Sequence, residues 1–263
     1  MLVTTSYEPS PEQLDRGRRL AAEAGGTFVP RKRLTLPGMR AKFGTPGGEA
    51  PAILVATERE LKYYTPEGTA LFFHPSTASI RAKRLLRGED DIMLAVTGVM
   101  PGDRVIDCTA GLGSDAIVFA LATGPLGAVT ALESEPAVAL LLQEGLAVYV
   151  SGIAALDEAM RRIDVRRVDH LAYLREQPDN SADIVYFDPM FRRPIGASSS
   201  ISPLRGMAND GALSPEAVAE AARVARKRVV LKEHRDSGEF ARLGFEKNAR
   251  GGATKVAYGV MTP

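Results

Sequence analysis

The pattern of apolar and polar positions along the chain changes near residue 75. Before that point, short runs rich in β-branched and aromatic residues are separated by Pro and Gly, which is typical of short strands. These runs are TFVP (27–30), AILVAT (52–57), ELKYYT (60–65) and ALFFHP (70–75). A helix is predicted over 11–25, because a Ser-Pro start precedes its apolar positions and two glycines follow them. Residues 1–75 therefore predict a small α+β domain.

From residue 76 onward, strand-like runs alternate with helical segments. The first helix has apolar positions at Ile80, Leu85 and Leu86, and a second apolar stretch ends at Pro101-Gly102. The strand-like runs that follow are RVIDCTA, AVTALES, IDVRRVD, DIVYFDP and RVVLKEH, with helices expected at 114–123, 136–150 and 214–226. Repeated β–α units predict a parallel sheet with helices on both faces. The last two runs, LGFEKNAR and ATKVAYGVM, predict an antiparallel hairpin at one edge.

Composition narrows the class of protein. With 263 residues, of which 45% are hydrophobic, the chain can bury a large core and is not expected to be disordered. It has no apolar run of about 18 residues and no secretory leader pattern, so a cytoplasmic, non-membrane protein is expected. The single Cys108 excludes an intrachain disulfide, and the three histidines show no zinc-site spacing, so no metal is expected.

Basic residues gather in two places in the first 90 residues. The first group is Arg31, Lys32, Arg33, Arg40 and Lys42, and the second is Arg81, Lys83, Arg84 and Arg87. Such clusters can contact phosphates. They can equally be solvated faces of the protein.

The segment DCTAGLGSDA (107–116) follows a strand and opens a helix. In that context Gly111 and Gly113 allow a backbone to approach a ligand closely. The third glycine of the dinucleotide fingerprint is missing, and Asp107 would repel a phosphate. The loop, which includes Thr109, therefore favours a ligand with a positively charged amino-acid end, such as S-adenosylmethionine, over NAD. Taken alone, it is also compatible with a turn that serves only packing.

Acidic residues end the next two strands. Glu133, with Ser134 beside it, stands where a carboxylate can accept both hydroxyls of a ribose. Asp169 can accept a hydrogen bond from the adenine amine while His170 packs near the ring. Each has a simpler interpretation as a solvated side chain.

The run DIVYFDPMFRRP (183–194) places Asp188-Pro189-Met190-Phe191 at the carboxyl end of a strand. This segment resembles the D-P-P-Y type motif of amino-group methyltransferases. A carboxylate and a neighbouring carbonyl can accept the hydrogens of an exocyclic amine as positive charge develops on it. Phe191 would stack on the base and the proline would stiffen the turn. By itself, Asp-Pro is also a common turn initiator.

Together, the motifs DCTAGLGSDA, ALESEPAVALLLQEGL, FDPMF and KVAYGVMTP resemble the RsmJ-type family of bacterial ribosomal RNA methyltransferases. The resemblance runs from about residue 72 to the C-terminus. It implies a Rossmann-like seven-stranded methyltransferase sheet in residues 76–263, S-adenosylmethionine as cofactor, and methylation of guanine N2 in 16S ribosomal RNA. By position, the cofactor contacts of the family would fall on Ser114, Asp115, Glu133, Ser134, Asp169, His170 and Asp188.

The sequence departs from the family at two places: the first departure is compatible with cofactor binding, and the second leaves the substrate open. Asp169-His170 stands where small hydroxyl residues are expected, and RRPIGASSSISPLRG replaces a lysine-rich stretch. DNA, a small-molecule amine or a non-catalytic cofactor-binding role therefore remain as alternatives to 16S RNA or the small ribosomal subunit. We hypothesise that the cluster Arg31, Lys32, Arg33, Arg40 and Lys42 helps to hold RNA, since phosphate contacts supply much of nucleic-acid affinity.

Overall fold

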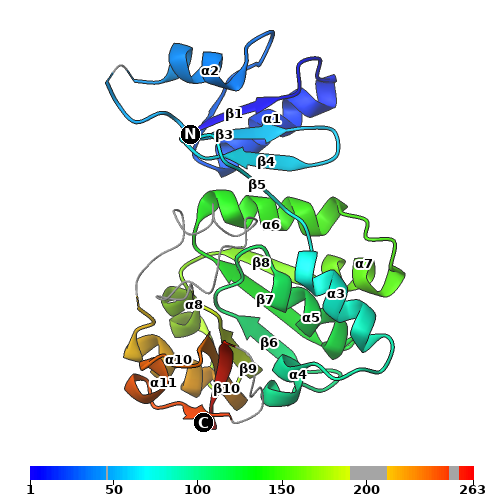
Figure 1. Ribbon diagram of the computed structural model, residues 1–263, viewed down its shortest axis with the longest axis vertical. Helices are drawn as coiled ribbons and strands as arrows, with labels where there is room; N and C mark the ends of the chain where they lie inside the picture. Colours follow the sequence, from blue (N-terminus) through cyan, green and yellow to red (C-terminus); the bar gives the residue numbers. More distant parts are fainter. Residues whose placement is uncertain (46, 190–211, 249–254) are drawn as a thin grey trace.

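The computed structural model describes residues 1–45, 47–189, 212–248 and 255–263, and it contains two sheets (Figure 1). The first is five-stranded, with the order β2-β1-β3-β4-β5. Its strands are β1 (Leu2–Thr5), β2 (Thr27–Phe28), β3 (Ile53–Ala56), β4 (Leu61–Tyr64) and β5 (Ala70–Phe72). Strand β1 pairs in parallel with β2 and β3, whereas β4 and β5 complete an antiparallel meander.

Two helices accompany this sheet. Helix α1 (Pro11–Glu23) starts at a capping box formed by Ser10 and Gln13, and it buries Gly17, Leu20 and Ala21. Helix α2 (Leu36–Phe43) is capped by Thr35 and buries Met39. The predicted helix and strands are confirmed, but sequence reasoning missed both β1 and α2.

The second sheet has seven strands, in the order β11-β12-β10-β9-β6-β7-β8. Its strands are β6 (Arg104–Asp107), β7 (Ala128–Glu133), β8 (Ile163–Arg167), β9 (Ala182–Phe187), β10 (Ala225–His234), β11 (Glu246–Lys247) and β12 (Val256–Met261). Strands β6 to β10 are parallel, and β12 runs antiparallel to both β10 and β11. This is the predicted Rossmann-like sheet with its antiparallel hairpin at one edge.

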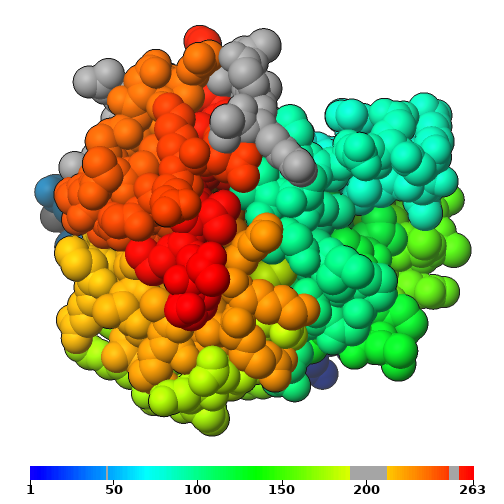
Figure 2. Space-filling model, turned by 90° about the horizontal axis from the view of Figure 1, so that it is seen from below, coloured from blue at the N-terminus to red at the C-terminus, as the bar shows by residue number. Residues whose placement is uncertain are grey.

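Helices cover both faces of the seven-stranded sheet. They are α3 (Ser76–Leu85), α4 (Ile92–Thr97), α5 (Ser114–Thr123), α6 (Pro136–Val148), α7 (Ala154–Arg161), α8 (His170–Glu176), α10 (Pro215–Val224) and α11 (Glu239–Arg242). One core joins α3, α4, α5, α6 and α7 to the first face, and a second joins α8, α10 and α11 to the other. Figure 2, viewed from below, shows the C-terminal segment in red with orange segments on either side of it, and in the sheet β12 lies between β10 and β11.

The buried face of α3 differs from the predicted one. Ile80 and Leu86 are 63% and 54% exposed, whereas Ala78 and Ala82 are buried. Small side chains one helical turn apart allow α3 to approach α5 closely, so the helix turns its alanines inward, and of the larger apolar positions Leu85 packs partly against the same core.

The two sheets share a core through α6. Leu20, Leu54 and Leu71 of the five-stranded sheet and its helix pack with Leu140 and Leu141 of α6. The Arg16 guanidinium on α1 also lies 2.6 Å from the Glu144 carboxylate on α6. The division of the chain between residues 75 and 76 remains a prediction. In the described part of the chain, no helix is long and apolar enough to cross a bilayer.

Candidate active site

Strand β6 is the middle one of the five parallel strands, with β7 on one side and β9 on the other. From β6 the chain continues to β7 and β8 on one side of the sheet, and then crosses to β9 and β10 on the other side. Open α/β sheets bind ligands beyond the carboxyl ends of the strands at such a crossover point. Asp107 ends β6 and Asp188 follows β9. The Asp188 backbone N–H donates to Thr109 Oγ1 at 2.6 Å. The fold therefore brings the glycine loop and the Asp-Pro motif side by side.

The two glycines of the loop both have left-handed backbone conformations. Gly111 has φ +54° and Gly113 has φ +79°. A Cβ atom on Gly113 would lie 2.6 Å from Leu142 Cδ1, whereas one on Gly111 would meet nothing within 4 Å. Gly113 therefore allows close packing on α6, and Gly111 faces open space that a ligand can use.

Helix α5 begins at Ser114, directly after the loop. The N–H groups of a first helical turn have no intrahelical acceptor and lie at the positive end of the helix dipole. They suit the carboxylate of an amino acid. The Ser114 hydroxyl lies 2.6 Å from the Thr77 hydroxyl, so α3 supports this turn.

Glu133 ends β7 beside the same loop, as its spacing predicts. Its carboxylate accepts hydrogen bonds from the Gly111 N–H at 3.1 Å and the Glu135 N–H at 2.8 Å. Burial raises the pKa of the Glu133 carboxyl above its ordinary value. Each carboxylate oxygen has a second lone pair, so the group can still accept a ribose hydroxyl. Ser134 is exposed next to it.

Asp169 and His170 follow β8, on the far side of β7. The Asp169 carboxylate caps α8 by accepting from the Leu171 and Ala172 N–H groups at 3.0 and 3.1 Å. The His170 ring packs edge-on against Phe187, with 5.7 Å between ring centroids, and burial lowers its pKa. The Val168 N–H donates to the Glu133 carbonyl at 3.1 Å, which brings this strand end close to Glu133.

Buried charges lie beneath the glycine loop. The Asp115 carboxylate contacts Arg81 Nη1 at 2.5 Å, the Tyr186 hydroxyl at 2.8 Å and Lys232 Nζ at 2.8 Å. Burial raises the pKa of the Asp115 carboxyl, but Lys232 and Arg81 outweigh burial and hold that pKa below its ordinary value. Asp107 is also buried, and its pKa lies well above the ordinary range for that reason.

Asp188 is the more accessible carboxylate of this group. Its side chain is 27% exposed, whereas that of Asp115 is 7% exposed. Lys232 Nζ lies 2.7 Å from Asp188 Oδ2. Burial, aided by Asp115 and opposed by Lys232, raises the pKa of Asp188 to about 6. Pro189 follows, whereas Met190 and Phe191 lie outside the described residues.

Sequence reasoning missed the two cations of the site. Arg81 was grouped with surface residues able to contact phosphates, but it is paired with Asp91 at 2.7 Å and with Asp115. Lys232 lies in β10, within the run RVVLKEH. The signal that could have revealed Lys232 is its position two residues after Val230, because alternate residues of a strand share a face.

The first basic cluster has mixed roles. Arg40 donates to the Pro51 and Thr65 carbonyls at 3.2 and 2.5 Å, and Arg31 lies over the Tyr7 ring at 4.1 Å. Both guanidiniums thus stabilise the small sheet and its loops. Lys32, Arg33 and Lys42 are exposed. The RNA-binding role of the cluster remains a prediction.

Comparison with known proteins identifies the family. A family model described as "Putative SAM-dependent methyltransferase" matches residues 48–243. The chain belongs to this methyltransferase family. It is 41% identical over 260 residues to "Uncharacterized protein YpiP" of Bacillus subtilis (strain 168), covering 99% of this chain and 98% of that one.

Two further comparisons agree with this family. The chain is 30% identical over 222 residues to "Ribosomal RNA small subunit methyltransferase J" of Stutzerimonas stutzeri (strain A1501), covering 81% of each chain. The crystal structure of a SAM-dependent methyltransferase from Neisseria gonorrhoeae has the same fold. It superposes with a TM-score of 0.63 at 19% identity, covering 100% of this chain and 96% of that one.

The cofactor of this methyltransferase is S-adenosylmethionine, and the residues of the site fit it. The site has more carboxylates than cations: Asp107 and Asp115 are buried and Asp91 and Asp188 are partly exposed, whereas the cations are Arg81 and Lys232. Excess negative charge suits a ligand that carries a sulfonium and an ammonium, and opposes a pyrophosphate. Open space at Gly111 and the Glu133 carboxylate beside it fit the rest of such a ligand.

Proposed function

We propose that this methyltransferase modifies the exocyclic N2 of a guanine in 16S ribosomal RNA. The observation that carries the proposal is the accessible Asp188 carboxylate beside the glycine loop, joined to it by the 2.6 Å bond between the Asp188 N–H and Thr109. The similarity to the Stutzerimonas relative, a ribosomal RNA small subunit methyltransferase by name, supports ribosomal RNA of the small subunit as the substrate class. Such a substrate is found in the bacterial cytoplasm.

Asp188 has two tasks in this proposal. Its carboxylate accepts a hydrogen bond from the amine, which aligns the nitrogen lone pair, and it stabilises the positive charge that develops there. When bound, S-adenosylmethionine supplies the methyl group from its sulfonium, so that the N–C bond forms as the S–C bond breaks. Asp188 then accepts the proton that the methylated nitrogen releases. Pro189 would stiffen the turn after Asp188, and the remaining motif residues, Met190 and Phe191, lie outside the described residues.

The residues around the glycine loop would hold the cofactor. We assign Glu133 and Ser134 to the ribose, Asp169 and His170 to the adenine, and the first turn of α5 to the amino-acid end. That turn contains Ser114 and Asp115, and the loop before it contains Asp107, Thr109, Gly111 and Gly113. The side chain of Asp115 is already paired, so its backbone N–H is the group that would meet the ligand.

The direct test is transfer of labelled methyl from S-adenosylmethionine to small-subunit particles, naked 16S RNA and DNA, followed by nucleoside analysis. We expect label in N2-methylguanosine. Asp188→Asn should reduce the rate by about 10²- to 10⁴-fold, the usual contribution of a positioned acid or base. The matched control is Asp183→Asn, at the other end of β9, where the carboxylate pairs with Arg226. It should retain activity.

The pH dependence follows from the raised pKa of Asp188. Below about pH 6 the carboxyl group is protonated, so it carries no negative charge and cannot take the proton from the methylated nitrogen, and kcat should fall on the acid side of pH 6. Label found only in DNA or in a small amine would replace the RNA substrate. Cofactor binding without transfer to any of these substrates would favour a non-catalytic protein.

A further inference from the structure

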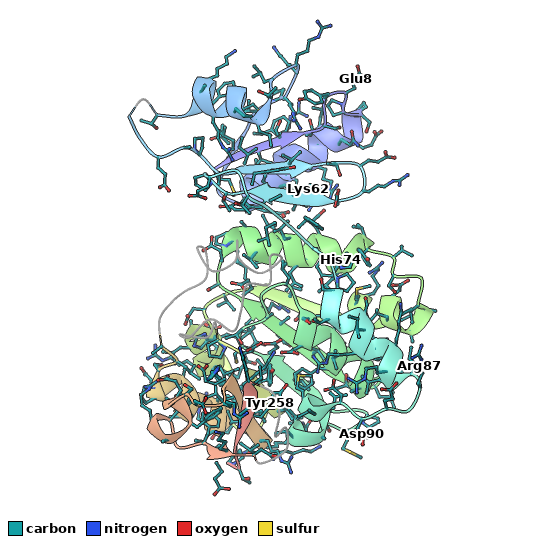
Figure 3. All side chains as sticks on the ribbon, in the orientation of Figure 1. Glu8, Lys62, His74, Arg87, Asp90 and Tyr258 are labelled. Carbon is teal, nitrogen blue, oxygen red and sulfur yellow. The ribbon has the colours of Figure 1, made fainter. Side chains whose placement is uncertain are left out.

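Lys232 reaches the candidate site from the strand next to Asp188. It lies on the face of β10 that Val230 shares, and α3, α4 and α5 cover this face. Its Nζ lies 2.8 Å from Asp115 Oδ2 and 2.7 Å from Asp188 Oδ2. Tyr258 of β12 is its cross-strand neighbour, and Figure 3 labels this residue in the lower half of the molecule. The ammonium group therefore bridges a buried carboxylate and an accessible one.

We propose that Lys232 is a positioning residue for methyl transfer, whose ammonium holds the Asp188 carboxylate in place beside the glycine loop. This inference deepens the proposed function, because it assumes that Asp188 is the group that receives the amine. In this role Lys232 acts through Asp188. Its Nζ holds the Oδ2 atom of Asp188, which leaves Oδ1 as the atom that would receive the amine.

The two carboxylates depend on Lys232 to different degrees. Asp115 also has Arg81 and the Tyr186 hydroxyl as partners. Among the residues that the structure describes, Lys232 is the one cation within ion-pair distance of Asp188. Loss of Lys232 should therefore affect Asp188 more than Asp115. A purely structural role for Lys232 would not predict this difference.

The groups that face Lys232 come from several elements. Arg81 on α3 and Asp115 on α5 lie on one side, Asp107 of β6 and Tyr186 of β9 lie within the sheet, and Tyr258 is on β12. Burial raises the pKa of Tyr258 to about 12, so its hydroxyl stays neutral near pH 7. Without the Lys232 ammonium, Asp188 would be left beside the charged Asp115, and the pKa of Asp188 would rise further.

The first experiment follows Asp188 directly, without substrate. Protein labelled with ¹³C at the aspartate carboxyl carbons is titrated by NMR, and the Asp188 resonance is assigned by its loss in Asp188→Asn. In Lys232→Gln the pKa of Asp188 should rise by about 1 to 3 units, the usual effect of one nearby opposite charge. The matched control is Lys227→Gln, on the same strand, where the lysine pairs with Asp103 and Asp183. It should leave the Asp188 titration unchanged.

The second experiment measures methyl transfer by the same variants. Lys232→Gln should lower kcat about 10- to 100-fold near pH 7 and move the acid limb of the kcat profile to higher pH by the shift seen in the titration. The dissociation constant for S-adenosylmethionine, measured by calorimetry, separates a loss of kcat from a change in cofactor affinity. Lys232→Arg should restore part of the activity, since it keeps the positive charge. Circular dichroism confirms that each variant is folded.

Either of two results would overturn the inference. One is an unchanged Asp188 titration in folded Lys232→Gln protein, and if this variant does not fold, the same result in folded Lys232→Met protein, which also lacks the charge, serves instead. The other is a loss that appears in cofactor affinity while kcat is unaltered. Failure of the proposed function gives a different result. The Asp188 titration would then still differ between wild-type and Lys232→Gln protein, but wild-type protein would not label 16S RNA.

Discussion

Gly111 and Gly113 share a left-handed backbone but have different surroundings. Gly113 is pressed against Leu142 of α6, and Gly111 borders open space. Gly111 therefore contributes to the approach of a ligand, and Gly113 contributes to the packing of the loop on α6. Their exchange for alanine should separate cofactor binding from stability.

We predict that Gly113→Ala costs about 2–4 kcal/mol of unfolding free energy, because it combines left-handed strain with a clash at Leu142. Gly111→Ala should cost only the strain, about 1–2 kcal/mol. Gly111→Ala should also weaken S-adenosylmethionine binding, because the added methyl group enters the space beside the loop, whereas Gly113→Ala should affect mainly stability. Urea denaturation and calorimetric titration of the cofactor measure both quantities. Equal stability losses in the two variants would show that the Leu142 contact is relieved without cost.

The residues at strand ends were predictable because parallel strands present their carboxyl ends at one edge. Asp107, Glu133 and Asp188 meet there, as their positions in the sequence indicated. The cations were not predictable in the same way. Arg81 pairs with a residue 34 positions further along the chain, and its neighbours in sequence, Lys83 and Arg84, suggested a surface cluster. Local spacing carries no information about such a partner.

At the scale of elements, α3 anchors the site from outside the sheet. Its Arg81 joins Asp91 at the start of α4 to Asp115 at the start of α5, and its Thr77 meets Ser114. Just before the helix, His74 bonds to the Tyr149 hydroxyl at 3.1 Å, and Figure 3 shows His74 beneath α6, where the chain passes between the two sheets. Helix α3 therefore fixes two helix starts that surround the ligand loop.

We predict that Arg81→Met destabilises the protein by about 3–5 kcal/mol, because it leaves the buried carboxylate of Asp115 without one of its cations. The control is Arg84→Met on the same helix, whose pair with Glu89 is about half exposed. It should cost less than about 1 kcal/mol. Urea denaturation at pH 7 distinguishes the two, and comparable losses would show that the buried pair contributes no more than the exposed one.

Elements were predictable where their pattern was strong. Helices α5 and α6 and strands β6, β7 and β9 are apolar runs bounded by turn residues. Strand β1 was missed because its four residues, LVTT, are too few to show a pattern. Helix α2 was missed because LPGMRAKF begins with Pro and Gly near its start, which reads as a turn. In both cases tertiary packing, rather than local preference, determines the element.

For the whole molecule, the shared core at α6 makes the two sheets interdependent. One side of α6 packs against the seven-stranded sheet through Leu142 and Leu146, and the other packs against the five-stranded sheet through Leu140 and Leu141 (Figure 1). The pair Arg16–Glu144 closes the rim of this contact. The small sheet therefore covers an apolar helix face of the methyltransferase fold.

We predict that Leu141→Ala lowers the unfolding free energy by about 2–5 kcal/mol, as expected for a fully buried leucine. Both sheets should unfold together in one transition. The control is Leu126→Ala, at a position that is 91% exposed, which should leave stability nearly unchanged. Differential scanning calorimetry measures the effect. Two separate transitions in the Leu141 variant would show that the sheets fold independently.

The position of β12 in the sheet has a consequence for folding during synthesis. This last strand lies between β10 and β11, which both precede it in the chain. During synthesis Asp115 is made first, Lys232 follows 117 residues later, and Tyr258 is made after Lys232. The group of charges that we propose for methyl transfer can therefore assemble only after β12 has been made and has entered the sheet between two strands that precede it in the chain.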